Sequence, residues 1–223
     1  MMSYRKLLVI VVSAFLVGLA LMGLLSVYLN RFEPKTLYPS EVTEYQGQDL
    51  SSISNIGYNA IAGTQYINAT TYRLNVTGLV NQTLSLTYNE TLAEFQTYQK
   101  VVTLHCVEGW SAKILWEGFL VKDLLAQAGA DPNATTVIFR ANDGYSTALP
   151  ISYIRDNNIL IAYKVNDVTL PSEHGFPFQL VAESQYGYKW IKWLTSIEVS
   201  NDSNHLGTWE SRGYPNNATV RNP

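Results

Sequence analysis

An apolar segment near the N-terminus, from Leu7 to Leu29, divides this chain into a part suited to lipid and a part suited to water. The segment reads LLVIVVSAFLVGLALMGLLSVYL and carries no charge. As a helix rising roughly 1.5 Å per residue, it is long enough to cross a hydrocarbon core of about 30 Å. A cleaved signal peptide is one alternative, although its apolar part is usually only about 7–15 residues long. A buried helix of a soluble domain is the other alternative. Residues 1–30 are therefore predicted to form an N-terminal membrane anchor or signal.

Two further features indicate which side of the membrane the rest of the chain faces. Arg5 and Lys6 directly precede the apolar segment, and the positive-inside rule places that end in the cytoplasm. Acceptor sequons for N-glycosylation, which are used only on exported chains, begin at Asn68, Asn75, Asn81, Asn89, Asn133, Asn201 and Asn217. The alternative for any one of them is the Asn and Thr content of polar strands. We predict a single-pass protein of the cell membrane, with an extracytoplasmic, glycosylated C-terminal domain.

The charge and cysteine content limit the possible partners and cross-links. The 15 Lys and Arg residues are scattered and are outnumbered by 18 Asp and Glu residues, which argues against nucleic acid as a partner. The single cysteine, Cys106, cannot form a disulfide within the chain. An exported thiol that stays unpaired is prone to oxidation or to pairing between molecules, so Cys106 needs either burial or a function.

The pattern of apolar residues predicts one domain from residue 66 to 214, after a polar stalk (31–65) and before a short tail (215–223). A short helix is expected near Thr87 and Glu90, whose spacing is close to a capping box, and a second before Gly129. Strands are expected in TTYRLNVTGLV, KVVTLHCV, TTVIFRANDGYSTALP, ILIAYKVNDVTLP, FPFQLVAES and WIKWLTSIEVS. Because no regular βαβ repeat is present, we expect an α+β domain with a largely antiparallel or mixed sheet.

Common cofactor and metal motifs are missing from the sequence. The histidines His105, His174 and His205 are too far apart for a zinc helix motif, and there is no Cys-X-X-Cys pair, Gly-X-Gly-X-X-Gly loop or Walker loop. A nucleophilic pair between Cys106 and His174 is conceivable. Cys106 is either a small buried apolar residue or, because it stands at the predicted end of a strand before Gly109, a thiolate ligand of a soft metal.

The segment LHCVEGWSAKILWEGFLVKDLL around Cys106 resembles the cysteine segment of the sulfite oxidase superfamily, which is the oxidoreductase molybdopterin-binding domain. Further resemblances follow in the same order: DGYSTALP, ILIAYKVNDVTLPSEHGFPFQLV, YGYKWIKWLTSIEV and TWESRGY. Together they cover about residues 72–214. The resemblance implies a sulfite-oxidase-type fold with mixed β-sheets and short helices. The apolar segment Leu7–Leu29 predicts one transmembrane helix before it.

The same resemblance implies a role for each matching residue. Cys106 would be a ligand of molybdenum, and His174 would bind the pterin or its phosphate. Asp143 would either bind a pterin nitrogen or simply hold its turn. The remaining predicted cofactor contacts are the phosphate loop of Gly187, Tyr188 and Lys189, the second cation Lys192, and Gln179.

Gln179 departs from the family pattern. It stands where the family usually has arginine, so a bidentate charged contact to the cofactor is lost there. Glu183 likewise stands in a segment where many family members have proline and further basic residues. A substrate site rich in arginine is therefore not expected, and Arg73, Arg140 and Arg155 are the remaining candidates.

These observations leave three functional hypotheses open. The first is a stand-alone, membrane-anchored molybdenum-molybdopterin oxidoreductase that transfers oxygen to or from a small molecule and exchanges electrons with a separate redox partner. The second is a cofactor-free surface binding or scaffolding module, motivated by Gln179 and by Arg5-Lys6, which forms only half of a twin-arginine export signal. The third is a hydrolase that uses Cys106 as its nucleophile, which requires a base beside the thiol.

Overall fold

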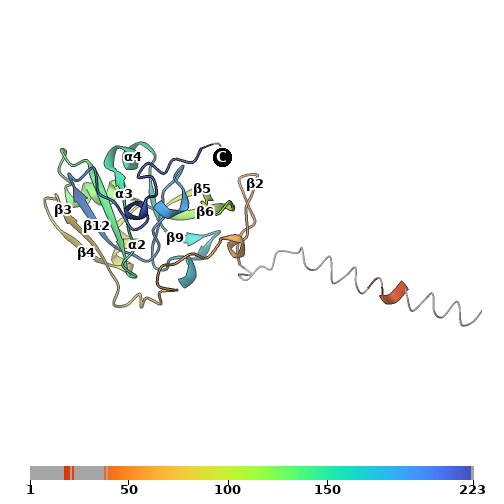
Figure 1. Ribbon diagram of the computed structural model, residues 1–223. Coiled ribbons are helices and arrows are strands. Elements are labelled where there is room, and N and C mark those ends of the chain that lie inside the picture. Colours follow the sequence, from red (N-terminus) through yellow and green to blue (C-terminus); the bar gives the residue numbers. More distant parts are fainter. Residues whose placement is uncertain (1–17, 21, 23–37, 39, 222–223) are drawn as a thin grey trace, which may run out of the picture. The chain divides into compact units, whose positions relative to one another are not determined.

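The computed structural model describes residues 18–20, 22, 38 and 40–221 (Figure 1). The predicted membrane anchor lies almost entirely outside these residues, although Gly18–Ala20 and Met22 are helical. Among the described residues, no helix is both long enough and apolar enough to cross a membrane. The chain divides into two compact units, residues 1–35 and 36–223, and all described strands belong to the second unit.

Cys106 follows a strand at the edge of an antiparallel sheet, which we call the cysteine sheet. Its strands are β5 (Tyr98–His105), β6 (Ser111–Leu120), β9 (Leu160–Val165), β10 (Val168–Thr169) and β11 (Gln179–Val181). They run in the order β10-β9-β6-β5, and β11 pairs with β9. The β6–β9 register shifts between Glu117 and Gly118. A Cβ atom at Gly118 would lie only 2.0 Å from the Ile161 carbonyl oxygen, so only glycine permits this close approach of the two strands.

A second sheet, the mixed sheet, contains both parallel and antiparallel strands. It consists of β3 (Arg73–Gly78), β4 (Leu84–Thr87), β7 (Thr136–Ala141), β8 (Ser146–Pro150) and β12 (Leu194–Ser200). The order is β4-β3-β12-β7-β8, and β12 pairs parallel to β3 but antiparallel to β7. The expectation of an α+β domain with mixed sheets and short helices is therefore confirmed.

The helices are short, and local sequence signals explain their ends. They are α2 (Tyr88–Glu94), α3 (Val121–Ala128), α4 (Ile151–Asp156) and the 3₁₀ turns η1 (Ile53–Asn55), η2 (Ser172–His174), η3 (Gly187–Lys189) and η4 (Glu210–Arg212). Thr87 and Glu90 form the predicted capping box at the start of α2. The α3 helix ends at Gly129, whose φ of 66° is left-handed, as expected for a glycine stop.

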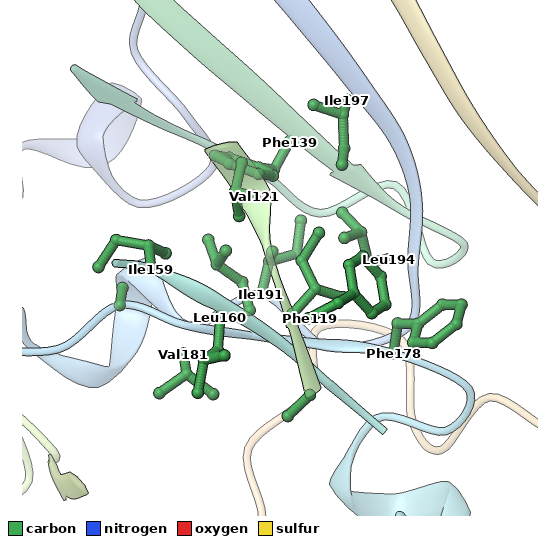
Figure 2. Close-up of a cluster of buried hydrophobic side chains, with 14 of the residues drawn as sticks. Phe119, Val121, Phe139, Ile159, Leu160, Phe178, Val181, Ile191, Leu194 and Ile197 are labelled. Carbon is green, nitrogen blue, oxygen red and sulfur yellow. The ribbon is translucent and has the colours of Figure 1, made fainter. Parts of the chain in front are cut away.

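The hydrophobic core draws side chains from both large sheets. Figure 2 shows Phe139 and Ile197 of the mixed sheet gathered in one cluster with Phe119 and Leu160 of the cysteine sheet. Phe178, just before β11, packs edge-on against Phe119 with the ring centroids 5.4 Å apart. This core holds the ends of the strands and the loops between them in place, and those loops carry the candidate site.

Both segments that were expected to flank the domain contribute to it. Within the predicted stalk, β1 (Glu44–Tyr45) and β2 (Gln48–Asp49) form a hairpin, and Ile53 of η1 is fully buried. Within the predicted tail, Ala218 is buried and accepts a hydrogen bond from the backbone N–H of Tyr186. The packed part of the chain therefore extends beyond residues 66–214, because these polar segments place a few apolar residues and backbone groups against the sheets.

Candidate active site

Cys106 is the first residue after β5 and begins a tight turn. Its backbone N–H donates to the Trp110 carbonyl oxygen (2.9 Å), and its own carbonyl accepts from the backbone N–H of Gly109 (3.1 Å). Gly109 has a φ of 91°, which side chains with a Cβ atom rarely adopt. The turn leaves Cys106 partly exposed at the end of the strand. The predicted position of the thiol at a strand exit is confirmed.

Two side chains contact the Cys106 thiol, and a third holds one of them in place. The amide nitrogen of Asn59 lies 3.7 Å from Sγ, and Oε2 of Glu108 lies 3.9 Å from it. The same Glu108 oxygen accepts hydrogen bonds from Asn59 Nδ2 and Trp110 Nε1, both at 3.3 Å. Burial raises the pKa of Cys106, and the Glu108 charge adds to this increase. In this environment the free thiol is held in its protonated form.

The thiol opens into a cavity of about 290 Å³. The lining comes from segments that are far apart in the sequence, from Ile56 to Tyr214. Seven of the eight predicted site residues line it: Cys106, Asp143, His174, Gln179, Gly187, Tyr188 and Lys192. The structure thus brings together most of the residues that were chosen from separate motifs.

His174 is buried at the end of η2, and its ring reaches the cavity. Within the described part of the chain, neither ring nitrogen has a hydrogen-bond partner, so both remain available to a ligand. Burial lowers the pKa of His174 to about 4, with a smaller contribution in the same direction from Lys192. The ring is therefore neutral near pH 7 and can either donate or accept a hydrogen bond.

The lowered pKa of His174 predicts a loss of stability in weak acid. Between pH 6.5 and about 4, the unfolded chain binds a proton at His174 and the folded protein does not. The free energy of unfolding should therefore fall as the pH is lowered through this range, by at most about 3 kcal/mol. Urea unfolding at several pH values should show this slope, and His174→Gln should flatten it. An unchanged slope in the variant would assign the effect to other groups.

Lys192 supplies a partly buried cation to the lining of the cavity. Its Nζ donates to the Glu173 carbonyl oxygen (3.0 Å) and lies over the rings of Tyr58 (4.7 Å) and Trp193 (4.5 Å). Burial lowers the pKa of Lys192 to about 8, against the opposing charges of Asp143 and Glu173. A cation held in this way is suited to an anionic group of a bound cofactor.

The η3 turn brings Gly187 and Tyr188 close to Cys106. The preceding residue, Tyr186, forms an isolated parallel bridge with His105. A Cβ atom at Gly187 would stand 3.8 Å from the Cys106 Cα. The Tyr188 hydroxyl donates to the Pro215 carbonyl oxygen (2.8 Å), which ties this turn to the C-terminal segment. The predicted loop therefore forms one wall of the cavity.

Lys189 is the predicted site residue that does not line the cavity. Its Nζ donates to Glu210 Oε1 (2.5 Å), Asn216 Oδ1 (3.0 Å) and the Ala148 carbonyl oxygen (3.1 Å). The side chains of Lys189 and Glu210 are 1% and 0% exposed. A phosphate contact from this ammonium group has no support in this geometry, because three protein oxygens already occupy its three donors.

Asp143 and Gln179 both face the cavity and also hold local structure. Asp143 Oδ1 accepts from the backbone N–H of Tyr145 (3.0 Å), as the turn interpretation predicts. Gln179 is buried at the start of β11 and pairs in register with Ala162. Both positions combine a structural role with access to the cavity.

The candidate arginines do not reach this cavity. Arg73 pairs with Glu90 (3.5 Å), Arg140 pairs with Glu198 (2.6 Å), and Arg155 lies in α4. None of these three side chains lines the cavity.

Sequence patterns had not singled out several of the lining residues. Asn59 lies in the segment that was interpreted as a stalk, and Glu108 and Trp110 lie beside Cys106 without any assigned role. Trp209 and Tyr214 form an aromatic pair at the other end of the lining, with ring centroids 5.3 Å apart. Glu108 and Trp110 could have been found only as members of the LHCVEGWS motif, and Trp209 and Tyr214 only as members of TWESRGY. Asn59 belongs to neither motif.

Comparisons with known proteins identify the same domain. The family model described as oxidoreductase molybdopterin binding domain matches residues 61–209. An uncharacterized oxidoreductase of Bacillus subtilis is 36% identical over 150 residues, covering 67% of this chain and 75% of the relative. A putative protein-methionine-sulfoxide reductase subunit of Azospira oryzae is 35% identical over 161 residues, covering 70% and 60%. Human mitochondrial sulfite oxidase is 31% identical over 174 residues, covering 65% of this chain but only 32% of the relative.

The fold agrees with a solved structure. The crystal structure of the sulfane dehydrogenase SoxCD from Paracoccus pantotrophus matches with a TM-score of 0.60 and 22% identity, covering 63% of this chain and 41% of that chain. At this identity the match supports the fold alone. Since the family model spans more than half of the sequence, this chain belongs to the oxidoreductase molybdopterin-binding domain family of the sulfite oxidase superfamily, a family of molybdopterin oxidoreductases.

Proposed function

We propose that this protein is a molybdenum-molybdopterin oxidoreductase that transfers an oxygen atom to or from a small extracytoplasmic substrate. The observation that carries the proposal is the chain's one thiol, Cys106, which opens at a strand end into a cavity of about 290 Å³. A thiolate is the soft ligand that a metal in such a cofactor requires. Membership in a molybdopterin-binding family supports the identity of the cofactor.

The side chains around the cavity fit such a cofactor. Cys106 would bind the metal, and the two unpartnered nitrogens of His174 would bind polar atoms of the pterin. Lys192 would hold its phosphate as a partly buried cation, together with the backbone of Gly187 and Tyr188. The donor set therefore matches a group that has one soft-metal end and one anionic end.

In the oxidative direction, a substrate X and water give XO, two protons and two electrons. The reverse reaction consumes XO, two protons and two electrons and gives X and water. The bound cofactor would supply the redox-active metal for this exchange. The chain's own residues would bind and orient the cofactor and substrate and shield them from water. Trp110 and Trp209 line the cavity with aromatic surface, and Asn59 and Glu108 place polar groups beside Cys106. The two electrons require a separate redox partner, and the similarity to a putative reductase subunit supports this requirement.

The proposed location follows from the N-terminal sequence. Leu7–Leu29 would anchor the chain in the cell membrane as a single pass, with the C-terminal domain outside and glycosylated. Two sequons support glycosylation by their geometry. Asn68 and Asn217 are exposed, and their side-chain oxygens accept from the hydroxyls of Thr70 (2.8 Å) and Thr219 (2.6 Å).

Metal analysis of the protein purified from its native host tests the proposal. We expect about one molybdenum atom and one pterin per chain, recovered from the membrane fraction. Native protein that lacks both molybdenum and pterin would contradict the enzyme assignment. Native protein in the soluble fraction would contradict the anchor and leave the enzyme assignment intact.

A second candidate is a binding module that retains the fold without the cofactor. The observation that favours it is the engagement of Lys189 by Glu210, together with the neutral Gln179, because both reduce the positive charge available to a phosphate. This module predicts that Cys106→Ser leaves partner binding unchanged in protein that never contained molybdenum.

A further inference from the structure

We infer that a second cavity, separate from the one at Cys106, is a sugar-binding site that takes the first sugar of an N-linked glycan on Asn217. The inference rests on the glycosylation that the proposed function includes, and it states where one glycan packs. The ligand class is an uncharged pyranose, such as an N-acetylhexosamine. This glycan is then part of the packed domain rather than a loose addition to its surface.

The second cavity has a volume of about 400 Å³ and shares no lining residue with the cavity at Cys106. Its walls come from the start of β7, from β8 and α4, from the loop after β12 and from residues 216–219. These segments are far apart in the sequence, so the cavity is a product of the fold. It is a separate site and not an extension of the first cavity.

The polar side chains of this lining are of the kinds that pair with sugar hydroxyl groups. They are mainly hydroxyls and amides, among them Thr136, Gln185 and Ser203. No Asp, Glu, Lys or Arg is found among the described residues that line the cavity, so an ionic ligand would meet no charged partner there. Leu149 and Tyr153 add apolar surface, which suits the C–H faces of a sugar ring.

His205 brings an unpaired nitrogen to this lining. Its Nε2 is shielded from water and has no hydrogen-bond partner among the described residues. On the other side of the ring, Nδ1 lies 3.7 Å from Asp202 Oδ2. A buried polar atom without a partner costs free energy, and a sugar hydroxyl can both donate and accept. Because the side chain is still 23% exposed, the ring has room to turn Nε2 toward such a ligand.

The acceptor for N-glycosylation belongs to the same wall. Asn217 and Thr219, the first and third residues of one sequon, both line the cavity. Asn217 Oδ1 accepts from the backbone N–H (3.2 Å) and from the hydroxyl (2.6 Å) of Thr219. This pairing leaves Nδ2, the atom that carries a glycan, without a hydrogen-bond partner in the described part of the chain. A sugar on Nδ2 therefore starts at the cavity wall.

Hydrogen bonds hold this wall in place without a sugar. The backbone N–H of Tyr186 donates to the Ala218 carbonyl oxygen (2.8 Å). Asn216 accepts from Lys189 Nζ (3.0 Å) and donates to the His205 carbonyl oxygen (3.3 Å). A wall that is already formed lowers the ordering cost of placing a sugar ring against it.

Attachment of the glycan requires a sugar linked to a lipid diphosphate and a transferase of the host. A bond forms between Asn217 Nδ2 and the anomeric carbon of the sugar. The bond from that carbon to the diphosphate oxygen breaks, the lipid diphosphate leaves with the electron pair, and the amide nitrogen loses one proton. Once attached, the first sugar meets the cavity in an intramolecular contact, at a high effective concentration.

Removal of single glycans tests the inference in full-length protein made in its native host. Mass spectrometry should find Asn217 glycosylated. Asn217→Gln should lower the Tm by about 4 °C, and by much less when variant and wild type are both made in a host without N-glycosylation. The second comparison accounts for the lost hydrogen bonds between Asn217 and Thr219. The difference between the two shifts is the glycan-dependent shift.

Asn68→Gln is the matched control, because Asn68 has the same local geometry without a cavity. Its Oδ1 accepts from the backbone N–H (2.9 Å) and the hydroxyl (2.8 Å) of Thr70, and Asn68 lines neither cavity. Its glycan-dependent shift should be below about 1 °C. His205→Phe keeps a ring but removes the nitrogen. In that background the glycan-dependent shift at Asn217 should fall to about half or less.

Equal glycan-dependent shifts at Asn217 and Asn68 would overturn the inference, as would native protein glycosylated at Asn68 but not at Asn217. A free sugar in the cavity would be lost on dialysis and would give Asn217→Gln no glycan-dependent shift, which also overturns it. Native protein without sugar at any sequon would overturn the proposed glycosylation together with the inference. Native protein without molybdenum would overturn the proposed enzyme alone and leave these shifts standing.

Discussion

Cys106→Ser is expected to lower the molybdenum content and the oxidoreductase activity of the protein by at least about 100-fold. Serine replaces a soft thiolate donor with a hydroxyl that is not ionised near pH 7. Loss of a residue that merely supports a metal ligand already costs about 10–100-fold in metal affinity or activity, so loss of the ligand itself should cost no less. Metal analysis, pterin analysis and single-turnover kinetics on matched preparations would measure the effect.

The fold of Cys106→Ser should survive the substitution. Cys106 is only partly buried, and its backbone hydrogen bonds with Trp110 and Gly109 do not involve the side chain. We therefore expect the free energy of unfolding of cofactor-free protein to change by less than about 1 kcal/mol. A variant that keeps full molybdenum content and activity would remove Cys106 from the role of metal ligand.

Glu210→Ala is expected to destabilise the folded protein by about 3–5 kcal/mol, because it leaves the Lys189 ammonium buried without its charged partner. The pair is almost completely inaccessible, at 1% and 0% exposure, and burial already lowers the pKa of Lys189. Glu210 also accepts from the Thr147 hydroxyl (2.9 Å), so the variant loses a second buried hydrogen bond. Urea unfolding of cofactor-free protein would measure the change.

Two controls distinguish the buried ion pair from a general effect of charge. Arg140→Ala breaks the Arg140–Glu198 pair, whose side chains are 43% and 36% exposed, and should cost less than about 1 kcal/mol. The double variant Lys189→Met/Glu210→Leu removes both buried charges and should recover much of the lost stability. Equal effects of Glu210→Ala and Arg140→Ala would contradict the assigned importance of burial.

The accurate sequence predictions concerned features that depend on neighbouring residues. The capping box of Thr87 and Glu90 and the glycine stop of α3 at Gly129 formed as expected, because their hydrogen bonds join residues only a few positions apart. The end of β5 before Cys106 was predicted from the β-branched run KVVTLHCV, which is also a local signal. Mixed sheets were also expected, but the pairing of β12 between β3 and β7 was not, since strand order depends on contacts between distant segments.

The candidate site shows the same limit at the level of single residues. Motifs identified Cys106 and His174, and the structure brings both to one cavity. No sequence pattern singled out Asn59, which comes from a polar segment and reaches the thiol only after that segment packs against the sheets. Glu108 was visible in the Cys106 motif, but its orientation toward the sulfur depends on donors from Asn59 and Trp110.

The sequence alone determined the apolar N-terminal segment, the lone thiol at a strand end and the family to which the domain belongs. Each of these can be recognised from residue types at fixed spacings. Only the tertiary structure determined where the two lysines of YGYKWIKW point and what they contact. Lys189 turns to the buried carboxylate of Glu210, and Lys192 faces the cavity. A cation taken out of water must be paired, and only the folded chain determines which partner lies within reach.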